Sequence, residues 1–135
     1  MKKKKVSYRS TCPISTTLDI LGDKWSLLII RDMVFKGKNT YGGFLEGGEH
    51  IATNILADRL AILEWAGVIS KGKHPDSKAK ILYKLTPKGI DLVPILVEII
   101  AWGEKYHDVS PRAKEFAKQI KKDKSGLIKM LMAGR

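Results

Sequence analysis

The sequence predicts a mainly helical fold that carries one small β-hairpin. Apolar residues recur at the spacing of an α-helix through most of the 135-residue chain. Between residues 68 and 85 the pattern changes to that of two strands on either side of a turn-forming segment. Helical spacing then resumes at Thr86-Pro87, a pair that is typical of a helix start. A chain of this length is expected to form one domain with a modest core.

Two helices are predicted in the first part of the chain. Cys12 and Pro13 mark the start of the first helix, because proline is favoured at the first helical position, and Gly22 ends it. The second helix is expected from Lys24 to about Phe35 and has almost no polar face. A helix that is apolar on all sides is buried, so we expect this one at the centre of the fold.

A short helix and a regular helix come next, with a glycine turn between them. The short helix is expected over residues 40–46, although Gly42 and Gly43 weaken it. Gly47-Gly48 forms the turn, and the regular helix is expected over residues 51–65, with Gly67 as its stop. One face of the regular helix is apolar and should contact the core; its residues are Leu56, Leu60 and Leu63.

The remaining elements are a hairpin, a long helix and a basic C-terminal helix. The strands are expected over residues 68–73 and 79–85, and the long helix over residues 86–107. Pro94 should bend the long helix or fall in its first turns. Ser110-Pro111 starts the last helix. A short helix, a turn, a regular helix and a two-stranded hairpin in this order predict a winged helix-turn-helix.

The net charge of +11 is unevenly distributed. Residues 1–11 carry five basic residues and no acid, and residues 112–135 carry a net charge of six. The intervening chain is therefore neutral overall, so the total charge alone says little about its partners. Within it, residues 71–88 hold six lysines against Asp76 alone. This local basic stripe on the predicted hairpin favours contact with an anionic partner.

The sequence favours a cytoplasmic protein that is not an enzyme. A single cysteine, Cys12, fits a reducing compartment, and no apolar segment is long enough for a membrane span or a signal peptide. His50, His74 and His107 lack metal-ligand spacing with one another or with Cys12. No glycine-rich phosphate loop follows a strand. We therefore expect no catalytic residues, no metal and no cofactor.

Four segments occur in a fixed order: Cys12-Pro13 with residues 18–25, residues 51–60, residues 63–69 and residues 83–89, followed by Trp102-Gly103. Together they resemble the HxlR-type branch of the MarR-like winged-helix regulators. The resemblance implies a DNA-binding homodimer, and two-fold symmetry implies a near-palindromic operator in double-stranded DNA. It identifies no small-molecule effector. Gly42-Gly43 departs from the pattern expected in the first helix of the motif.

The domain organisation follows from these elements. We expect residues 1–11 to form a disordered basic tail. Residues 12–109 should form the DNA-binding domain with its dimerisation helices, and residues 110–135 a C-terminal helical extension. The resemblance covers the middle segment, whereas an extension of this kind is found only in some members of the family.

The helix over residues 51–65 is the predicted recognition helix. If its leucines face the core, Thr53, Asn54, Ala57 and Asp58 lie on or beside the outer face. Asparagine can pair with adenine through two hydrogen bonds, and threonine can contact a base edge. Two alternatives stay open: the outer face is an ordinary solvated one, or the chain is a protein-interaction module without specific DNA binding, as the acidic residues of this helix would allow.

Basic residues around this helix are candidates for phosphate contact. On the hairpin, lysines also serve to prevent edge-to-edge strand pairing, so two interpretations compete. Arg59 borders the core face, and a structural salt bridge competes there with phosphate contact. The candidates are Lys36, Lys38, Arg59, Lys71, Lys73, Lys78 and Lys80.

Dimerisation is expected through the first helix, the long helix and the C-terminal tail, because a chain this small cannot bury the apolar surface of the long helix alone. The predicted interface residues are Ile14, Leu18, Leu92, Leu96, Ile99 and Trp102.

Cys12 has two interpretations. A thiol at a helix N-terminus is favoured as the reactive thiolate, and some HxlR-type regulators use such a cysteine to sense oxidants or electrophiles. The alternative is a small buried apolar residue at the start of the helix. A single cysteine could respond only through an intermolecular disulfide or an adduct.

Overall fold

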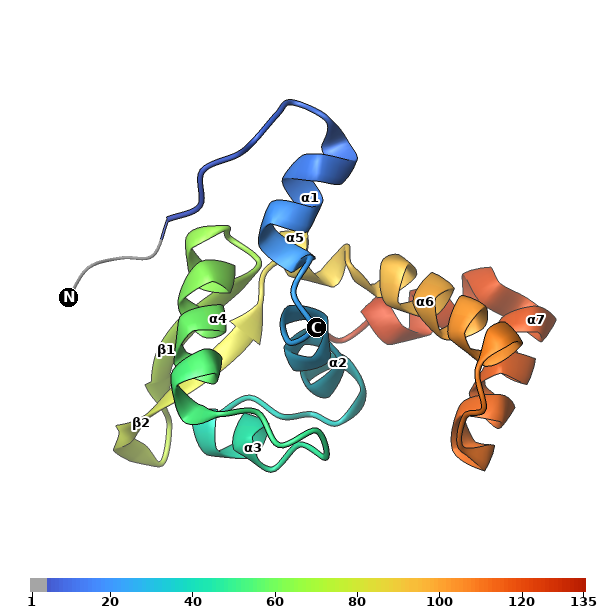
Figure 1. The fold of residues 1–135 in the computed structure, drawn as a ribbon. Coiled ribbons are helices and arrows are strands. Elements are labelled where there is room, and N and C mark those ends of the chain that lie inside the picture. The colour runs from blue at the N-terminus through green and yellow to red at the C-terminus, as the bar shows by residue number, and fades with distance from the viewer. Residues whose placement is uncertain (1–4) are drawn as a thin grey trace. The chain divides into compact units, whose positions relative to one another are not determined.

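The computed structural model describes residues 5–135, which form seven helices and one two-stranded antiparallel sheet (Figure 1). The chain divides into two compact units, of which the first ends at Gly89 and the second runs from Ile90 to Arg135. The elements are α1 (Pro13–Leu21), α2 (Ser26–Phe35), α3 (Tyr41–Leu45), α4 (Thr53–Trp65), β1 (Ile69–His74), β2 (Ser77–Leu85), α5 (Pro87–Ile90), α6 (Val93–Tyr106) and α7 (Pro111–Met132). The predicted mainly helical fold with a hairpin is confirmed.

Helix α1 begins and ends as predicted, whereas α2 begins two residues later than Lys24. Cys12 is extended at the N-cap, and Gly22 is the C-cap. The carboxylate of Asp23 accepts hydrogen bonds from the backbone N–H groups of Trp25, at 2.8 Å, and Ser26, at 2.9 Å. These bonds hold the chain in a turn and delay the helix start. The predicted central position of α2 is confirmed, since it buries Ile29, Ile30, Met33 and Val34.

The segment before α1 forms neither helix nor strand over residues 5–11. Arg9 nevertheless pairs with Asp19, with 2.6 Å between Nε and Oδ1, and the Tyr8 ring centroid lies 6.1 Å from that of Trp65. This part of the predicted disordered tail therefore has specific contacts. The tail lysines at positions 2, 3 and 4 lie outside the described residues.

Helices α3 and α4 form the predicted helix-turn-helix. Thr40 caps α3, because its side-chain oxygen accepts a hydrogen bond from the N–H of Gly43 at 3.1 Å. Helix α4 begins at Thr53, two residues after the predicted start, and ends before Gly67, whose φ of +76° favours glycine. The predicted core face is confirmed: Leu56, Leu60 and Leu63 are buried.

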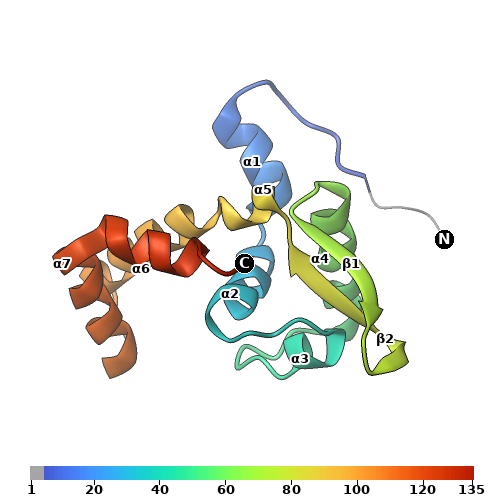
Figure 2. The ribbon, with the colours of Figure 1, turned by 180° about the vertical axis from the view of Figure 1, so that it is seen from behind.

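The hairpin pairs β1 with β2 in an antiparallel register that joins Ile69 to Leu85 and Lys71 to Tyr83. It packs along α4 through β1, as the view from behind shows (Figure 2). Most of its residues are exposed, but Tyr83 is buried, and its backbone N–H donates to the carbonyl oxygen of Asn39 at 2.8 Å. The loop before α3 is therefore attached to the hairpin.

The prediction of a single helix over residues 86–107 is wrong. The structure has the short helix α5 and then α6, with Asp91 and Leu92 between them and Pro94 in the first turn of α6. Proline lacks the N–H group that a helix interior requires, so it starts a new helix here. The boundary between the two compact units, after Gly89, also lies in this region.

Helix α7 packs against α6 within the second unit. It starts as predicted, with the Ser110 side chain accepting a hydrogen bond from the N–H of Ala113 at 3.2 Å. At Asp123 the backbone leaves helical geometry (φ −157°, ψ 77°). The Asp123 carboxylate accepts a hydrogen bond from the N–H of Gly126 at 3.0 Å and so caps the second half of the helix.

Candidate nucleic-acid interface

The first turns of α4 present the predicted base-reading residues to solvent. Thr53, Asn54 and Ala57 are exposed, whereas Asp58 is half-buried. Asn54 offers an amide that can both donate and accept hydrogen bonds, and the small side chain of Ala57 leaves room beside it for a base pair. This part of α4 is therefore shaped for close approach to a partner.

Tyr41 positions the start of α4. Its hydroxyl donates a hydrogen bond to the backbone carbonyl oxygen of Thr53 at 2.8 Å. The bond links the beginning of α3 to the beginning of α4 across the turn between them. This role of Tyr41 was not predicted, because a side chain that reaches across a turn leaves no periodic signal in the sequence.

Arg59 is held by ion pairs. Its Nε lies 3.3 Å from an Asp23 carboxylate oxygen, and Nη1 lies 3.4 Å from Asp58. Burial alone would raise the pKa of Asp23, but hydrogen bonds from Ser26 and Trp25 and the charge of Arg59 together lower it. The charged pair thus ties α4 to the turn before α2. Of the two interpretations weighed for Arg59, the structural salt bridge is the one that the geometry favours.

The basic candidates fall into two groups. Lys73, Lys78 and Lys80 are exposed on the hairpin and form no ion pair with any described residue. The others each lie near a carboxylate: Lys36 is 3.8 Å from Asp32, Lys38 is 3.3 Å from Glu46, and Lys71 is 3.6 Å from Glu64. The carboxylates of Glu46 and Glu64 are at least partly exposed, and pairs of this kind contribute little to stability, so Lys38 and Lys71 can exchange partners at small cost. The carboxylate of Asp32 is buried.

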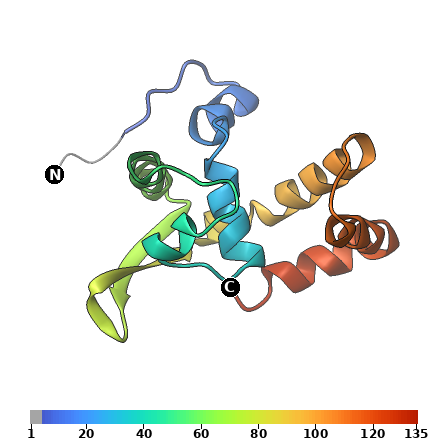
Figure 3. The same cartoon turned by 60° about the horizontal axis from the view of Figure 1, so that its bottom comes forward.

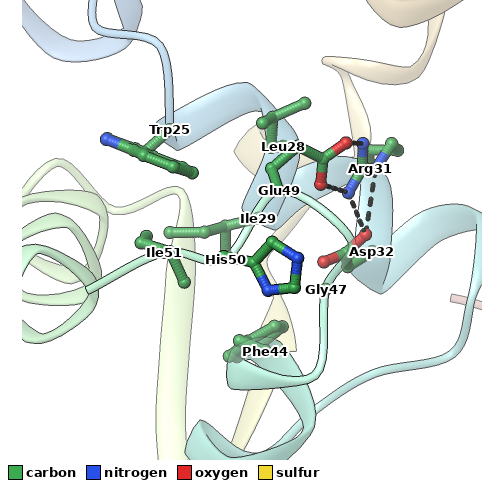
Figure 4. A pocket seen from close by; sticks show the side chains of 10 residues that line it. All are labelled: Trp25, Leu28, Ile29, Arg31, Asp32, Phe44, Gly47, Glu49, His50 and Ile51. Atoms are coloured by element: carbon green, nitrogen blue, oxygen red, sulfur yellow. Dashed lines mark hydrogen bonds and ion pairs between the residues drawn. The ribbon is translucent and has the colours of Figure 1, made fainter. Parts of the chain in front are cut away.

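An arginine–carboxylate cluster holds the turn between α3 and α4 against α2 (Figure 4). Arg31 donates to both carboxylate oxygens of Glu49, at 2.7 and 2.8 Å, and to Asp32 at 2.9 Å. The hydrogen bonds from Arg31 lower the pKa of Glu49 to about 2. The adjoining cavity, lined also by Phe44 and His50, measures about 20 Å³. That is room for a single water molecule, not for a drug-sized ligand.

Residues of α3, of the loop before it and of β2 line a larger groove, which we call the α3–hairpin groove. Figure 3 shows α3 beside the hairpin. The volume of the groove is about 560 Å³. The hydrogen bond between Tyr83 and Asn39 joins its two sides. Polar and small residues dominate its lining, including Lys38, Tyr41, Gly42, Glu46 and Lys80.

The predicted dimer residues differ in exposure. Ile14 and Leu18 on α1 are 72% and 52% exposed, and Ile99 and Trp102 on α6 are 47% and 61% exposed. By contrast, Leu92 and Leu96 are only 8% and 6% exposed. These two leucines have little surface to offer a second subunit, so we correct their assignment from interface to core. Their side chains lie on the inner side of their segment, which periodicity alone did not separate from the outer side.

Cys12 is a free, exposed cysteine at the N-cap of α1. The alternative of a buried apolar residue is therefore wrong for this chain. Among residues 5–135, no three histidine, cysteine, aspartate or glutamate side chains gather in a group that could hold a metal ion. In the same part of the chain, no helix has the length and apolar character needed to span a membrane.

Comparison with known proteins places these features in a family. A family model described as HxlR-like helix-turn-helix matches residues 20–111. The chain is 35% identical over 97 residues to the HTH-type transcriptional regulator YdeP of Bacillus subtilis, a match that covers 72% of this chain and 75% of YdeP. It is 32% identical to YybR of the same organism, over 81% of this chain and 88% of YybR.

Solved structures show the same architecture. The crystal structure of PA1607, a candidate transcription factor, superimposes with a TM-score of 0.68 at 40% identity and covers 76% of this chain and 70% of that one. The oxidized form of the redox regulator HypR gives a TM-score of 0.63 at 30% identity, over 73% of this chain and all of HypR. The family match over residues 20–111 includes the helix-turn-helix and the hairpin, which carry the surface described above.

Proposed function

The chain belongs to the HxlR-like helix-turn-helix family of transcriptional regulators, and on this premise we propose that it binds specific duplex DNA as a homodimer. The observation that carries the proposal is the exposed start of α4, where Thr53, Asn54 and Ala57 face solvent. Asn54 is the residue that we assign to adenine recognition, and Thr53 and Ala57 contact neighbouring base edges. Asp58 borders this group and discriminates against bases that it would repel.

The hairpin lysines supply the sequence-independent part of the affinity. Lys73, Lys78 and Lys80 have no competing carboxylate among the described residues, so they contact phosphates or the minor groove. Lys38 and Lys71 contribute after leaving their weak surface pairs. Lys36 contributes after leaving the buried carboxylate of Asp32, which keeps its ion pair with Arg31. Arg59 acts through its ion pair with Asp23, which holds α4 in place.

The homodimer forms through exposed apolar side chains that a monomer leaves in water. Ile14 and Leu18 on α1, and Ile99 and Trp102 on α6, are at least 47% exposed. Residues 12–109 then act as the DNA-binding domain with its dimerisation helices, and residues 110–135 as an extension. Two recognition helices related by a two-fold axis enter successive major grooves about 34–36 Å apart, which requires a near-palindromic operator.

Cys12 is proposed as the site of a thiol response. Its exposure is the observation that favours this role, since an oxidant or electrophile can reach the sulfur. The similarity to the redox regulator HypR is in keeping with such a role. Because the chain has one cysteine, the product is either a disulfide between two copies or an adduct with a small molecule.

The proposal is tested by measuring binding to duplex DNA from the region upstream of the protein's own gene, at several salt concentrations. We compare the wild type with Asn54→Ala and with the double variant Lys78→Ala/Lys80→Ala. Asn54→Ala should cost about 1–3 kcal/mol on the specific duplex only. The lysine variant should weaken binding to all duplexes and lower the salt dependence.

A second candidate function is a protein-interaction module on the same scaffold. The acidic residues Asp58 and Glu64 on α4, which would repel phosphate, favour it. The same experiment separates the two functions. Binding to DNA that depends steeply on salt supports the regulator, because phosphate contacts release counterions. If no duplex is bound specifically, the protein-interaction module replaces the DNA-binding regulator as the proposed function.

A further inference from the structure

We propose that the α3–hairpin groove receives a phosphodiester strand of the bound duplex, and that Gly42 lacks a side chain so that this strand can approach the backbone of α3. This inference rests on the proposed DNA-binding function and deepens it. It assigns a role to a residue that departs from the pattern expected in the first helix of the motif.

Nothing within the fold requires glycine at position 42. The residue lies in α3 and is exposed. A Cβ atom added there would meet no atom within 4 Å, and the backbone is outside the positive-φ region that favours glycine. Glycine is among the least favourable residues in a helix. A glycine that weakens its helix without serving the fold points to something outside the chain that must come close.

The next residue shows the contrast. A Cβ atom on Gly43 would lie 3.1 Å from the hydroxyl oxygen of Thr40, which accepts the capping hydrogen bond of α3. Gly43 is therefore explained by the fold itself, through its close contact with the cap. Both glycines line the groove, but of the two Gly42 is the exposed one, and an added Cβ atom there meets nothing within the fold.

The charge of the groove fits a phosphodiester. Lys38 lines one side and Lys80 lines the other. The one carboxylate in the lining belongs to Glu46, and it is paired with Lys38 at 3.3 Å. Lys80 forms no ion pair with any described residue. The groove thus carries a positive side chain that is not neutralised, which suits a singly charged phosphate of the DNA backbone.

The groove is also continuous with the recognition helix. Tyr41, which lines it, donates its hydroxyl hydrogen bond to the carbonyl oxygen of Thr53 at 2.8 Å. A strand in the groove would therefore pass beside the residue that sets the position of α4. Phosphate contacts of this kind set the register in which base-reading side chains meet the bases.

The test compares glycine variants that are equally open to solvent. Gly42→Ala and Gly42→Asp place a methyl group or a carboxylate in the groove. Gly48→Ala and Gly48→Asp are the matched controls, because Gly48 is exposed, lies outside the groove and has no atom within 4 Å of an added Cβ. Melting temperature and dissociation constants are measured for all four variants and the wild type, with the upstream duplex and an unrelated duplex of equal length.

We expect both Gly42 variants to melt at or above the wild-type temperature while binding both duplexes more weakly. The alanine variant should lose affinity roughly tenfold and the aspartate variant roughly a hundredfold, with a salt slope reduced by about 0.9 for one lost phosphate contact. Gly48→Ala should bind DNA within about twofold of the wild type, and Gly48→Asp should lose far less affinity than Gly42→Asp. If the wild type binds DNA and the Gly42 variants match their Gly48 controls, the inference is overturned and the proposed function stands. A wild type that binds no DNA overturns both.

Discussion

The hydroxyl of Tyr41 donates a hydrogen bond of 2.8 Å to the backbone carbonyl oxygen of Thr53. It joins the first residue of α3 to the first residue of α4. The orientation of the recognition helix therefore depends on a residue that lies on its neighbour. Small changes in that orientation would move Asn54 relative to a base, since hydrogen bonds to bases require close geometry.

Removing the Tyr41 hydroxyl should weaken specific DNA binding. Tyr41→Phe keeps the ring and loses one hydrogen bond, which contributes about 0.5–1.5 kcal/mol. We expect a loss of about this size in affinity for the specific duplex and a smaller change for unrelated DNA, measured by fluorescence anisotropy. Tyr106→Phe, at an exposed position on α6, is the control. Equal affinities for Tyr41→Phe and the control would show that the bond does not set the position of α4.

Acid should remove the contribution of Glu49 to stability. Its pKa in the folded chain is about 2, below its ordinary value of 4.5, because Arg31 donates two hydrogen bonds to its carboxylate. The lowered pKa means that the stabilisation is fully present above about pH 4.5 and is lost as the pH falls toward 2. Solvent screens this half-exposed pair, so we expect less than about 1 kcal/mol.

The measurement is urea unfolding of the wild type and Glu49→Gln between pH 7 and pH 2.5. The difference in free energy of unfolding should shrink across the acid range. A difference that stays constant with pH would contradict the assignment of the lowered pKa to Arg31.

Gly89 should tolerate no side chain. A Cβ atom there would overlap the carbonyl oxygen of Val68 and lie 3.0 Å from a methyl carbon of Leu85. The backbone would have to shift, and we expect Gly89→Ala to cost more than about 2 kcal/mol in the free energy of unfolding. Gly72→Ala, where an added Cβ meets nothing within 4 Å, should cost far less. Similar urea midpoints for the two variants would show that the chain relaxes easily around position 89.

The dimer should depend on α6. Trp102→Glu and Ile99→Glu each place a charge on a side chain that is now 61% or 47% exposed. Burying an unpaired charge in an interface is costly, so both variants should be monomeric at micromolar concentration in light scattering. Ile81→Glu, at a 44% exposed position on the hairpin, should stay dimeric. A monomeric wild type would contradict the proposed interface.

Cys12 should carry the whole thiol response. Treatment with diamide or a quinone should change the DNA affinity of the wild type several-fold and leave Cys12→Ser unchanged. Non-reducing gel electrophoresis separates the two products, since a disulfide between copies doubles the mass and an adduct does not. If Cys12→Ser responds to the oxidant as the wild type does, the sulfur of this residue is not the sensor.

The sequence predicted the parts of the fold that depend on local pattern. The apolar spacing of Leu56, Leu60 and Leu63 was sufficient to orient α4, because helical periodicity determines which side chains share a face. Gly67 and Ser110 were recognised as helix boundaries for equally local reasons, a positive φ and a side-chain cap. The same periodicity predicted that Thr53 and Asn54 lie on the outer face of α4, where both are exposed.

Local pattern did not predict features that depend on how segments distant in the sequence pack together. Pro94 could bend one helix or start another, and the structure has it in the first turn of α6. Leu96 and Ile99 are both apolar residues on that helix, yet Leu96 is buried and Ile99 is 47% exposed. Apolar character alone does not say whether a side chain meets its own chain or a second copy.

By itself, the sequence determined the helix-turn-helix, the hairpin and the outer face of α4, since each follows from interactions between residues close together in the chain. Only the tertiary structure decided that Arg59 pairs with Asp23, that Tyr41 bonds to Thr53, and that Gly42 lines an open groove. These contacts join elements whose approach depends on packing of the whole first unit. A local sequence pattern therefore cannot predict the geometry of these contacts.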